Sequence, residues 1–277
     1  MSRMNRKVYL VVGILLIFPV LFCVGGAKEA PAPDKKGGAV RLKEDNFVVI
    51  RGHINGPSAT KVIEEMWEHQ NDEELYVYIS SPGGFVSSGM EIVRMMQSLT
   101  ENGVKVKCIA DTALSMGFVI FQYCPVRLVM PSSILMQHQL SMNLRGPINH
   151  VVSYLQFVKS MEEIIDSYQA KRLELTVPDF LTKIGYDWWL YGENAIKNKA
   201  ADSVANVICD FEKGYVDEVY QTIFGEITVT YLNCPLANYP VKISFGEDEM
   251  NVDVDKIVSE WARQNNTGGI DYSWYRG

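Results

Sequence analysis

Apolar residues along the chain alternate between short continuous runs and helical spacing. Continuous runs at 47–50 and 75–79 predict strands, and so does the segment 104–110, where two lysines alternate with apolar residues. Between them, apolar residues spaced by three and four predict helices near 58–69 and over 89–99. Strands that alternate with helices in this way favour an α/β fold with parallel strands.

The same alternation continues to residue 209. The pattern predicts an apolar helix over 115–124, strands over 127–130 and 134–137, one long amphipathic helix between 148 and 175, a short helix near 193–199 and a strand over 204–209. Residues 212–277 show a different pattern. We predict a small accessory α+β extension here, with strand-like segments at 227–232 and 241–245 and a helix at 253–264.

Residues 8–27 form an uncharged, apolar run of 20 residues that follows Arg3, Arg6 and Lys7. This run predicts either a signal peptide cleaved after Ala27 or an uncleaved membrane anchor, with a buried core helix as the remaining alternative. The basic residues before it favour a cytoplasmic N-terminus and an extracytoplasmic body. A linker rich in Pro, Gly and Lys follows over 28–40.

Composition excludes several classes of function. A net charge of -7, from 26 Lys and Arg against 33 Asp and Glu, leaves no basic surplus for a nucleic-acid partner. Four His and five Cys without any C-x-x-C or H-E-x-x-H spacing predict no metal site. In an oxidising compartment Cys108 could bridge Cys124, and Cys209 could bridge Cys234, although free buried cysteine is the commoner state.

Three features with chemical potential follow predicted strands. Ser115 lies where a strand passes into an apolar helix, so it is either a helix cap or a nucleophile held at a helix N-terminus. Paired glycines close the segment 80–84, which is either a tight turn or a place where backbone approaches a ligand. His138 ends another strand, as a structural residue or a base. Since α/β folds gather their sites at strand carboxyl ends, we expect these features to converge, with Asp187 as the orienting acid.

Four stretches resemble the ClpP family of serine peptidases, within the ClpP/crotonase superfamily. They are LYVYISSPGGFVSSG at Leu75–Gly89, ALSMG at Ala113–Gly117, MQHQ at Met136–Gln139 and DWWLYGENAIKNKAAD at Asp187–Asp202. The resemblance covers about 160 of the 277 residues, and the motifs follow the family order. It implies a repeated β-β-α superhelix over 41–211, with the accessory extension after it and no cofactor.

The resemblance also implies a role for each matching residue. Ser115 would be the nucleophile, His138 the general base and Asp187 the acid that orients the imidazole. The backbone N–H groups of Gly84 and Met116 would form the oxyanion hole. Gly83, Phe85 and Val86 would bind substrate, because 85–87 would pair with the substrate backbone as an added strand.

This chain departs from the family in two places. Leu140-Ser141-Met142-Asn143 stands where the family continues into a proline and a glycine-rich strand, and Gly185-Tyr186 stands where it often carries a Glu-Arg pair used between stacked rings. These departures affect the second wall of the peptide groove and ring stacking, while a single homo-oligomeric ring stays compatible with the sequence.

The sequence therefore predicts a serine endopeptidase that acts on peptides or unfolded segments outside the cytoplasm. We expect a periplasmic protein, secreted or anchored to the inner membrane by residues 8–27, whose unfoldase partner, if any, is unidentified. An SppA-like signal-peptide peptidase using Lys183 or Lys197 in a Ser–Lys dyad is one alternative. A non-catalytic ring-forming scaffold is another, and a crotonase-type acyl-CoA enzyme is remote.

Overall fold

The computed structural model describes residues 38–222 and 225–245. The expected signal or anchor segment at 8–27 and the expected helix at 253–264 lie outside these residues. Within the part of the chain that is described, no helix combines the length and apolar character needed to cross a membrane.

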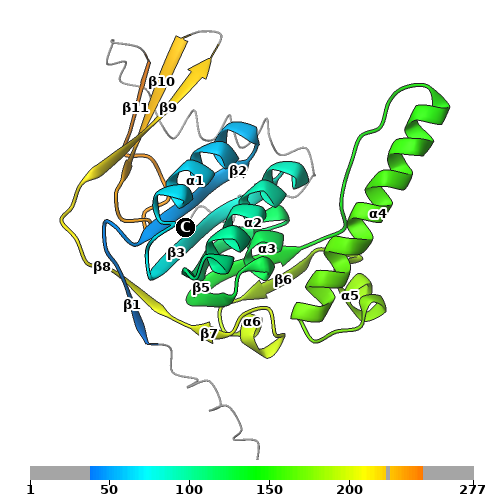
Figure 1. Ribbon diagram of the computed structural model, residues 1–277, viewed down its shortest axis with the longest axis horizontal. Coiled ribbons are helices and arrows are strands. Elements are labelled where there is room, and N and C mark those ends of the chain that lie inside the picture. Colours follow the sequence, from blue (N-terminus) through cyan, green and yellow to red (C-terminus); the bar gives the residue numbers. More distant parts are fainter. Residues whose placement is uncertain (1–37, 223–224, 246–277) are drawn as a thin grey trace, which may run out of the picture. The chain divides into compact units, whose positions relative to one another are not determined.

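A mixed sheet forms the centre of the fold, with strand order β2-β3-β4-β5-β6 and β7 paired to β5 (Figure 1). Its strands are β2 (Phe47–Ile54), β3 (Glu74–Gly84), β4 (Lys105–Leu114), β5 (Val126–Gln137), β6 (Trp188–Tyr191) and β7 (Ser203–Val204). Strands β2 to β5 and β7 pair in parallel, and β6 runs antiparallel to β5. The predicted α/β fold is thereby confirmed.

Three helices cover one face of this sheet, namely α1 (Gly56–Glu68), α2 (Val86–Glu101) and α3 (Met116–Tyr123) (Figure 1). They bury the main apolar core, in which Val77 of β3, Ile92 of α2 and Phe118 of α3 have almost no exposed surface. The apolar spacing of α1 and α2 follows from this, because only the stripe facing the sheet needs to be apolar.

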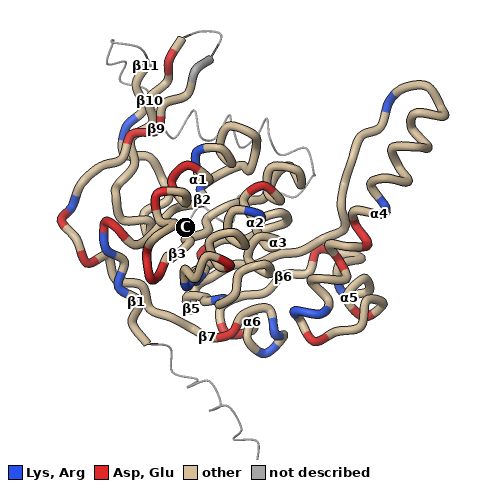
Figure 2. Tube along the Cα trace, in the orientation of Figure 1, with Lys and Arg blue, Asp and Glu red and all other residues tan. Residues whose placement is uncertain are grey.

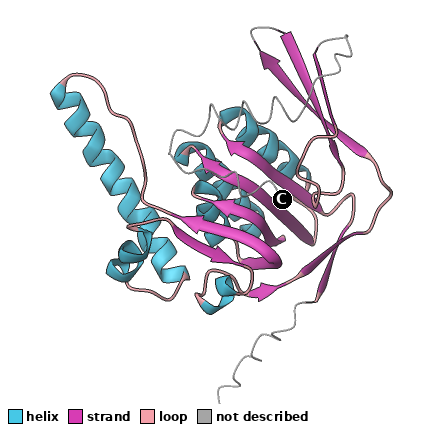
Figure 3. Cartoon of the chain, turned by 180° about the vertical axis from the view of Figure 1, so that it is seen from behind, coloured by secondary structure: helices cyan, strands magenta, loops and turns pink. Residues whose placement is uncertain are grey.

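A smaller apolar cluster lies on the opposite face of the sheet (Figure 3). There, Tyr78 and Ile109 pack with Leu42 from a ribbon of two parallel strands, β1 (Ala39–Leu42) and β8 (Asn206–Cys209). The central strands are thus apolar on both faces, which explains their continuous apolar runs.

One strand, β5, replaces the two strands predicted at 127–130 and 134–137. The β4–β5 register shifts between Ala110 and Thr112, so that residues 130–133 form an irregularity within one continuous strand. The polar stretch Pro131-Ser132-Ser133 produced the apparent break in the pattern. Its Ser133 hydroxyl bonds Ala110 O, which holds the irregularity in the sheet.

The second half of the domain contains α4 (Ile148–Arg172), α5 (Val177–Ile184) and α6 (Asn194–Lys197). The long predicted helix exists as α4, but it ends at Arg172, and α5 is a separate helix capped by Thr176. The sequence pattern missed α5, β1 and β6 because each is too short to establish a period.

The accessory extension contains a three-stranded antiparallel sheet of order β11-β10-β9. Its strands are β9 (Tyr215–Thr222), β10 (Gly225–Leu232) and β11 (Lys242–Phe245), of which β9 was not predicted. Contacts with β2 hold it: Arg51 lies 3.6 Å from Glu218 and 4.1 Å from the Tyr231 ring centre.

The described residues contain two disulfide bonds, Cys108–Cys124 and Cys209–Cys234. The first joins β4 to the end of α3 and is fully buried in the main core. The second ties β8 to the segment after β10. Free cysteine, the commoner state expected from the sequence, is therefore not what the structure shows.

Candidate active site

Ser115 occupies a strained turn between β4, which ends at Leu114, and α3, which begins at Met116. Its φ of 53° and ψ of -118° lie in a region that residues with a side chain seldom adopt. The Ser115 N–H donates to Met136 O at 2.8 Å, and its carbonyl accepts from Val119 N at 3.1 Å. The neighbouring strand and helix thus fix both sides of the residue, a condition under which such strain persists at functional sites.

Glycines allow the end of β3 to approach this turn. Gly83 has a φ of +100°, and a Cβ added to it would lie 2.7 Å from the Ser115 Cβ. A Cβ on Gly84 would overlap the backbone of Ile54, and one on Gly117 would lie 3.3 Å from Ser81 O. Because these contacts are with backbone or with the turn itself, no flexible group could move aside to admit a side chain.

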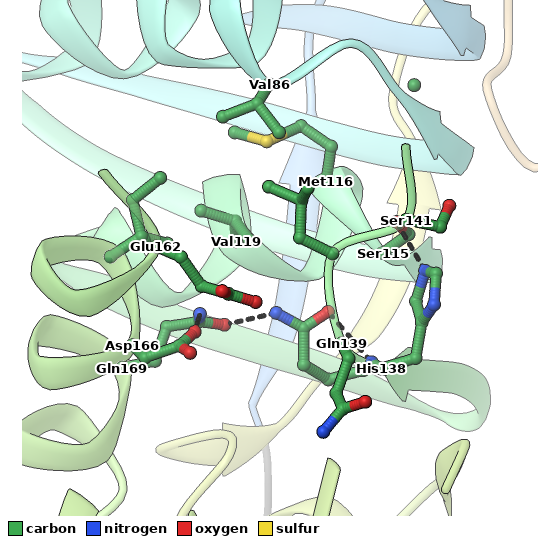
Figure 4. A pocket seen from close by; sticks show the side chains of 14 residues that line it. Val86, Ser115, Met116, Val119, His138, Gln139, Ser141, Glu162, Asp166 and Gln169 are labelled. Carbon is green, nitrogen blue, oxygen red and sulfur yellow. Dashed lines mark hydrogen bonds between the residues drawn. The ribbon is translucent and has the colours of Figure 1, made fainter. Parts of the chain in front are cut away.

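His138 lies one residue beyond β5, and its Nε2 is 2.8 Å from the Ser115 Oγ (Figure 4). Strand register explains the meeting, since Leu114 at the end of β4 pairs with Met136 of β5. Ser115 comes directly after β4 and His138 directly after β5, so the two residues lie side by side at the carboxyl ends of these paired strands. A neutral imidazole in this position can accept the serine proton, which is what activates a serine hydroxyl.

Asp187 stands next to His138 in the sheet without bonding to it. Strands β5 and β6 pair up to Gln137 opposite Trp188, so His138 and Asp187 are the next residues outward. Asp187 is exposed, and among the residues described no hydrogen bond or ion pair joins its carboxylate to the imidazole. The structure thus brings together the first two predicted catalytic residues and leaves the third adjacent.

A pocket of about 100 Å³ opens beside this pair. Ser115, His138 and Gly84 line it together with the apolar side chains of Val86 and Met116, and Val119 and Ile165 add to its apolar lining. Small-molecule sites usually measure about 300–1,000 Å³. The pocket is accordingly sized for one side chain of a longer substrate.

Two predicted oxyanion donors remain compatible with the geometry. Met116 is the first residue of α3, so its N–H has no partner within the helix. Gly84 lines the pocket, whereas the N–H of Gly83 already donates to the Ser81 Oγ at 3.1 Å. Gly84 and Met116 thus flank Ser115, while Gly83 supplies close packing.

The expected substrate-pairing strand at 85–87 is not present, because α2 begins at Val86. Phe85 is extended and exposed, but its N–H donates to Ile54 O and its carbonyl accepts from Gly89 N. With both of its backbone groups used, Phe85 has none left for an added strand. Val86 contacts the pocket through its side chain instead. Residues 138–147 also form no strand, so the second wall of the groove is an irregular segment.

Residues 37–207 match the family model described as Clp protease. The chain belongs to the Clp protease family. The matched span contains the Ser115–His138 pair, the paired glycines and Asp187, and it ends before β9.

Membership of the Clp protease family indicates a serine peptidase, in a family whose members generally form oligomeric rings and act on peptide substrates. The fold agrees, since its mixed sheet with helices is consistent with that of ClpP. The sheet β9–β11 lies outside the family match.

Neither lysine considered for a Ser–Lys dyad lines the Ser115 pocket. The Lys183 Nζ lies 5.0 Å from the centre of the Trp188 ring. Lys197 lines a different hollow, with Glu193 and Asp202. Of these three side chains, His138 is thus the one that lies within hydrogen-bond distance of the Ser115 hydroxyl.

A buried chain of polar side chains, which the apolar pattern of the sequence did not predict, leads from His138 to α4 (Figure 4). The His138 N–H donates to the Gln137 Oε1 at 3.3 Å, and the Gln137 Nε2 donates to the Gln169 Oε1 at 2.7 Å. Gln169 in turn donates to the Asp166 Oδ1 at 3.4 Å. The signal in the sequence was two polar residues three apart, Asp166 and Gln169, on the buried face of the long helix, which a search for apolar spacing passes over.

Burial first, and the negative charge of Glu162 second, raise the pKa of Asp166 to about 6. Both carboxylates line the pocket. Near neutral pH this end of the pocket therefore carries negative charge in a poorly solvated place.

Proposed function

We propose that this protein is a serine endopeptidase in which Ser115 attacks the peptide carbonyl and His138 accepts its proton. The observation that carries the proposal is the 2.8 Å contact between the Ser115 Oγ and the His138 Nε2, made at a strained turn. Attack forms the C–O bond to Ser115 and an oxyanion. Collapse then breaks the C–N bond as His138 returns the proton to the leaving amine, and water hydrolyses the acyl-enzyme by the same steps.

The oxyanion would be held by the backbone N–H groups of Gly84 and Met116. One such preplaced donor contributes about 3 kcal/mol to transition-state stabilisation in serine peptidases. The glycine at position 84 fits this role, since its backbone reaches the pocket only because no Cβ is present.

Ser115→Ala tests the proposal by hydrolysis of a fluorogenic peptide library and labelling with a fluorophosphonate. We expect the wild type to cleave peptides and to be labelled, and the variant to lose both, with a fall of at least about 10⁴-fold in kcat. Ser132→Ala, an exposed serine of β5, is the matched control and should behave as the wild type. Equal hydrolysis by the wild type and Ser115→Ala would overturn the mechanism. A wild type that neither cleaves nor labels would favour the ring-forming scaffold.

Asp187 would orient the His138 imidazole, which requires its exposed carboxylate to turn toward the adjacent ring. In serine peptidases, replacing this acid by its amide lowers kcat by about 10⁴-fold. We expect Asp187→Asn to lower kcat by at least about 10²-fold with little change in KM. Asp179→Asn, at the start of α5, is the control. A change of less than threefold in Asp187→Asn would mean that Ser115 and His138 act as a dyad.

We further propose that the protein works outside the cytoplasm, delivered by residues 8–27 as a signal peptide or as an inner-membrane anchor. The two disulfides support this location, because such bonds persist in oxidising compartments. N-terminal sequencing of the purified native protein, with fractionation of cells, tests it. A mature chain beginning near Lys28, or a full-length chain in the membrane fraction, is expected. A full-length chain in the cytosolic fraction would contradict it.

A further inference from the structure

The pocket beside Ser115 changes character along its length. Near the serine its lining is backbone and apolar side chain, from Gly84, Val86 and Met116. Glu162 and Asp166 of α4 line it as well, and Figure 4 shows these acids across the pocket from the Ser115–His138 pair.

Among the described residues, no counter-charge accompanies the acids at that end. Asp166 is 6% exposed, and its Oδ1 accepts a hydrogen bond from the Gln169 Nε2. Among the residues that the structure describes, neither Asp166 nor Glu162 forms an ion pair with Lys, Arg or His. An acidic side chain so deeply buried is normally paired, because an unpaired buried charge is costly.

Acidic residues on α4 gather in one part of the helix (Figure 2). They are Glu162, Glu163 and Asp166, and the first and third share a face at a spacing of four residues. Like charges at this spacing destabilise a helix. No contact among the described residues therefore explains why these acids lie together. Their arrangement is that expected of a site that binds a cation.

We propose that this pocket binds the side chain of a lysine or arginine that precedes the scissile bond of the substrate. The inference rests on the proposed peptidase function and names its substrate class. A basic side chain matches both halves of the pocket: its methylene stem packs against Val86, Met116 and Val119, while its cationic end reaches the carboxylates of Glu162 and Asp166. Binding of the basic side chain itself forms and breaks no covalent bond.

The buried amide chain positions the acidic end relative to the catalytic end. Gln137 and Gln169 are 4% and 0% exposed, and their side chains link the backbone of His138 to Asp166. Because α4 is joined to β5 in this way, the distance between the carboxylates and Ser115 is held by bonded groups. The lysine or arginine is thus selected by length as well as by charge.

Matched peptides that differ only in the residue before the scissile bond test the proposal. Lysine, arginine, norleucine and glutamate are compared, since norleucine keeps the stem of lysine without its ammonium. We expect kcat/KM for lysine and arginine to exceed that for norleucine by at least about tenfold. Glutamate should be the poorest. In the double variant Glu162→Gln/Asp166→Asn, the ratio of lysine to norleucine should fall to within about threefold of one.

Glu163→Gln is the control for loss of acidic charge, because it removes one negative charge from the same helix at an exposed residue outside this pocket. It should keep the wild-type ratio. A wild type that cleaves norleucine peptides as well as lysine peptides would overturn the proposal, and so would an unchanged ratio in the double variant.

Calorimetric binding of the same peptides to Ser115→Ala separates this inference from the proposed function. Tighter binding of the lysine peptide than of the norleucine peptide, by about tenfold, supports the pocket assignment even if the wild type cleaves neither. Selective binding without cleavage would contradict the peptidase function alone. Equal binding of both peptides, with Ser115-dependent cleavage intact, would contradict the pocket assignment alone.

Discussion

The two ends of the Ser115 pocket are built by different means. At the nucleophile end, backbone conformation decides the geometry: the φ of Ser115 is positive, and Gly83 packs against it. At the acidic end, side chains of one helix decide it, through Asp166 and Glu162. At the backbone-built end, an added atom displaces the backbone that holds Ser115. At the side-chain-built end, a substitution can change the charge while the backbone stays in place. We therefore expect substitutions at the first end to abolish the reaction and those at the second to change its selectivity.

Gly83→Ala should have the largest effect. The added Cβ would lie 2.7 Å from the Ser115 Cβ and 2.8 Å from Leu114 O, so the strained turn must shift. A displacement of about 1 Å can cost about 10²-fold in rate, and we expect at least that loss in kcat/KM.

Gly103→Ala is the control for that substitution. Gly103 has a φ of +98°, close to the +100° of Gly83, but a Cβ there meets nothing within 4 Å. Both variants carry the same backbone strain, about 1–2 kcal/mol. Only Gly83→Ala also crowds the serine. If kcat/KM fell equally in both variants, strain rather than the clash would be the cause.

Loss of the Cys108–Cys124 disulfide should have the next largest effect. This bond closes a 16-residue separation that contains Ser115, and both cysteines are fully buried. A loop of this length corresponds to about 3 kcal/mol of stabilisation in the chain-entropy account. We expect Cys108→Ala/Cys124→Ala to lower the free energy of unfolding by about that amount in urea titrations.

The second disulfide provides the comparison, because Cys209–Cys234 lies between β8 and the accessory sheet. Cys209→Ala/Cys234→Ala should loosen that sheet, seen as faster amide exchange in β9 and β10, while peptide hydrolysis is unchanged. If Cys209→Ala/Cys234→Ala lost peptide hydrolysis faster than Cys108→Ala/Cys124→Ala, the second disulfide would not act on the accessory sheet alone.

The two ends also differ in how far the sequence could predict them. The α/β fold and the convergence of Ser115 and His138 follow from apolar runs and from residues at strand ends, since parallel neighbours place their carboxyl ends together. The acidic end depends on which face of α4 meets the sheet. Asp166 and Gln169 are polar residues on a buried face, and no rule of apolar spacing can place them there.

Two further differences have local physical causes. A helix occupies the place of the expected substrate strand, because α2 begins at Val86 and only Phe85 separates it from the paired glycines. Asp187 could be placed beside His138 by register, but register alone does not direct a side chain, and its carboxylate remains in solvent. The sequence could not establish the disulfide bonds, because a bond requires two cysteines whose Cα atoms lie about 6 Å apart, and the tertiary fold sets that distance.

Asp166→Asn should stabilise the protein at neutral pH. The pKa of this carboxyl is raised to about 6, from an ordinary value of 3.8, by burial first and by Glu162 second. Between these two values the folded protein binds more protons than the unfolded chain, so stability falls as pH rises from about 4 to 6 and stays lower above. The amide does not titrate. We expect the free energy of unfolding of Asp166→Asn at pH 7.5 to exceed that of the wild type by at most about 3 kcal/mol. This difference should vanish below about pH 4. An advantage independent of pH would show that the charge of Asp166 is not what destabilises the wild type.

The smallest expected effect is a change of selectivity with pH. Asp166 shares its surroundings with Glu162 and Glu163 of α4 and with His138 after β5, and no Lys or Arg lines the two hollows that it borders. Acidification toward pH 5 should protonate Asp166, whose pKa is near 6, while a substrate lysine stays charged. The kcat/KM ratio of lysine to norleucine peptides should therefore fall by a few fold between pH 7.5 and 5. Taking this ratio cancels any protonation that slows both reactions alike. In Asp166→Asn the ratio should vary less with pH than in the wild type. An equal pH dependence in the two proteins would show that Asp166 does not sense the substrate cation, and that Glu162 alone provides the charge at the acidic end.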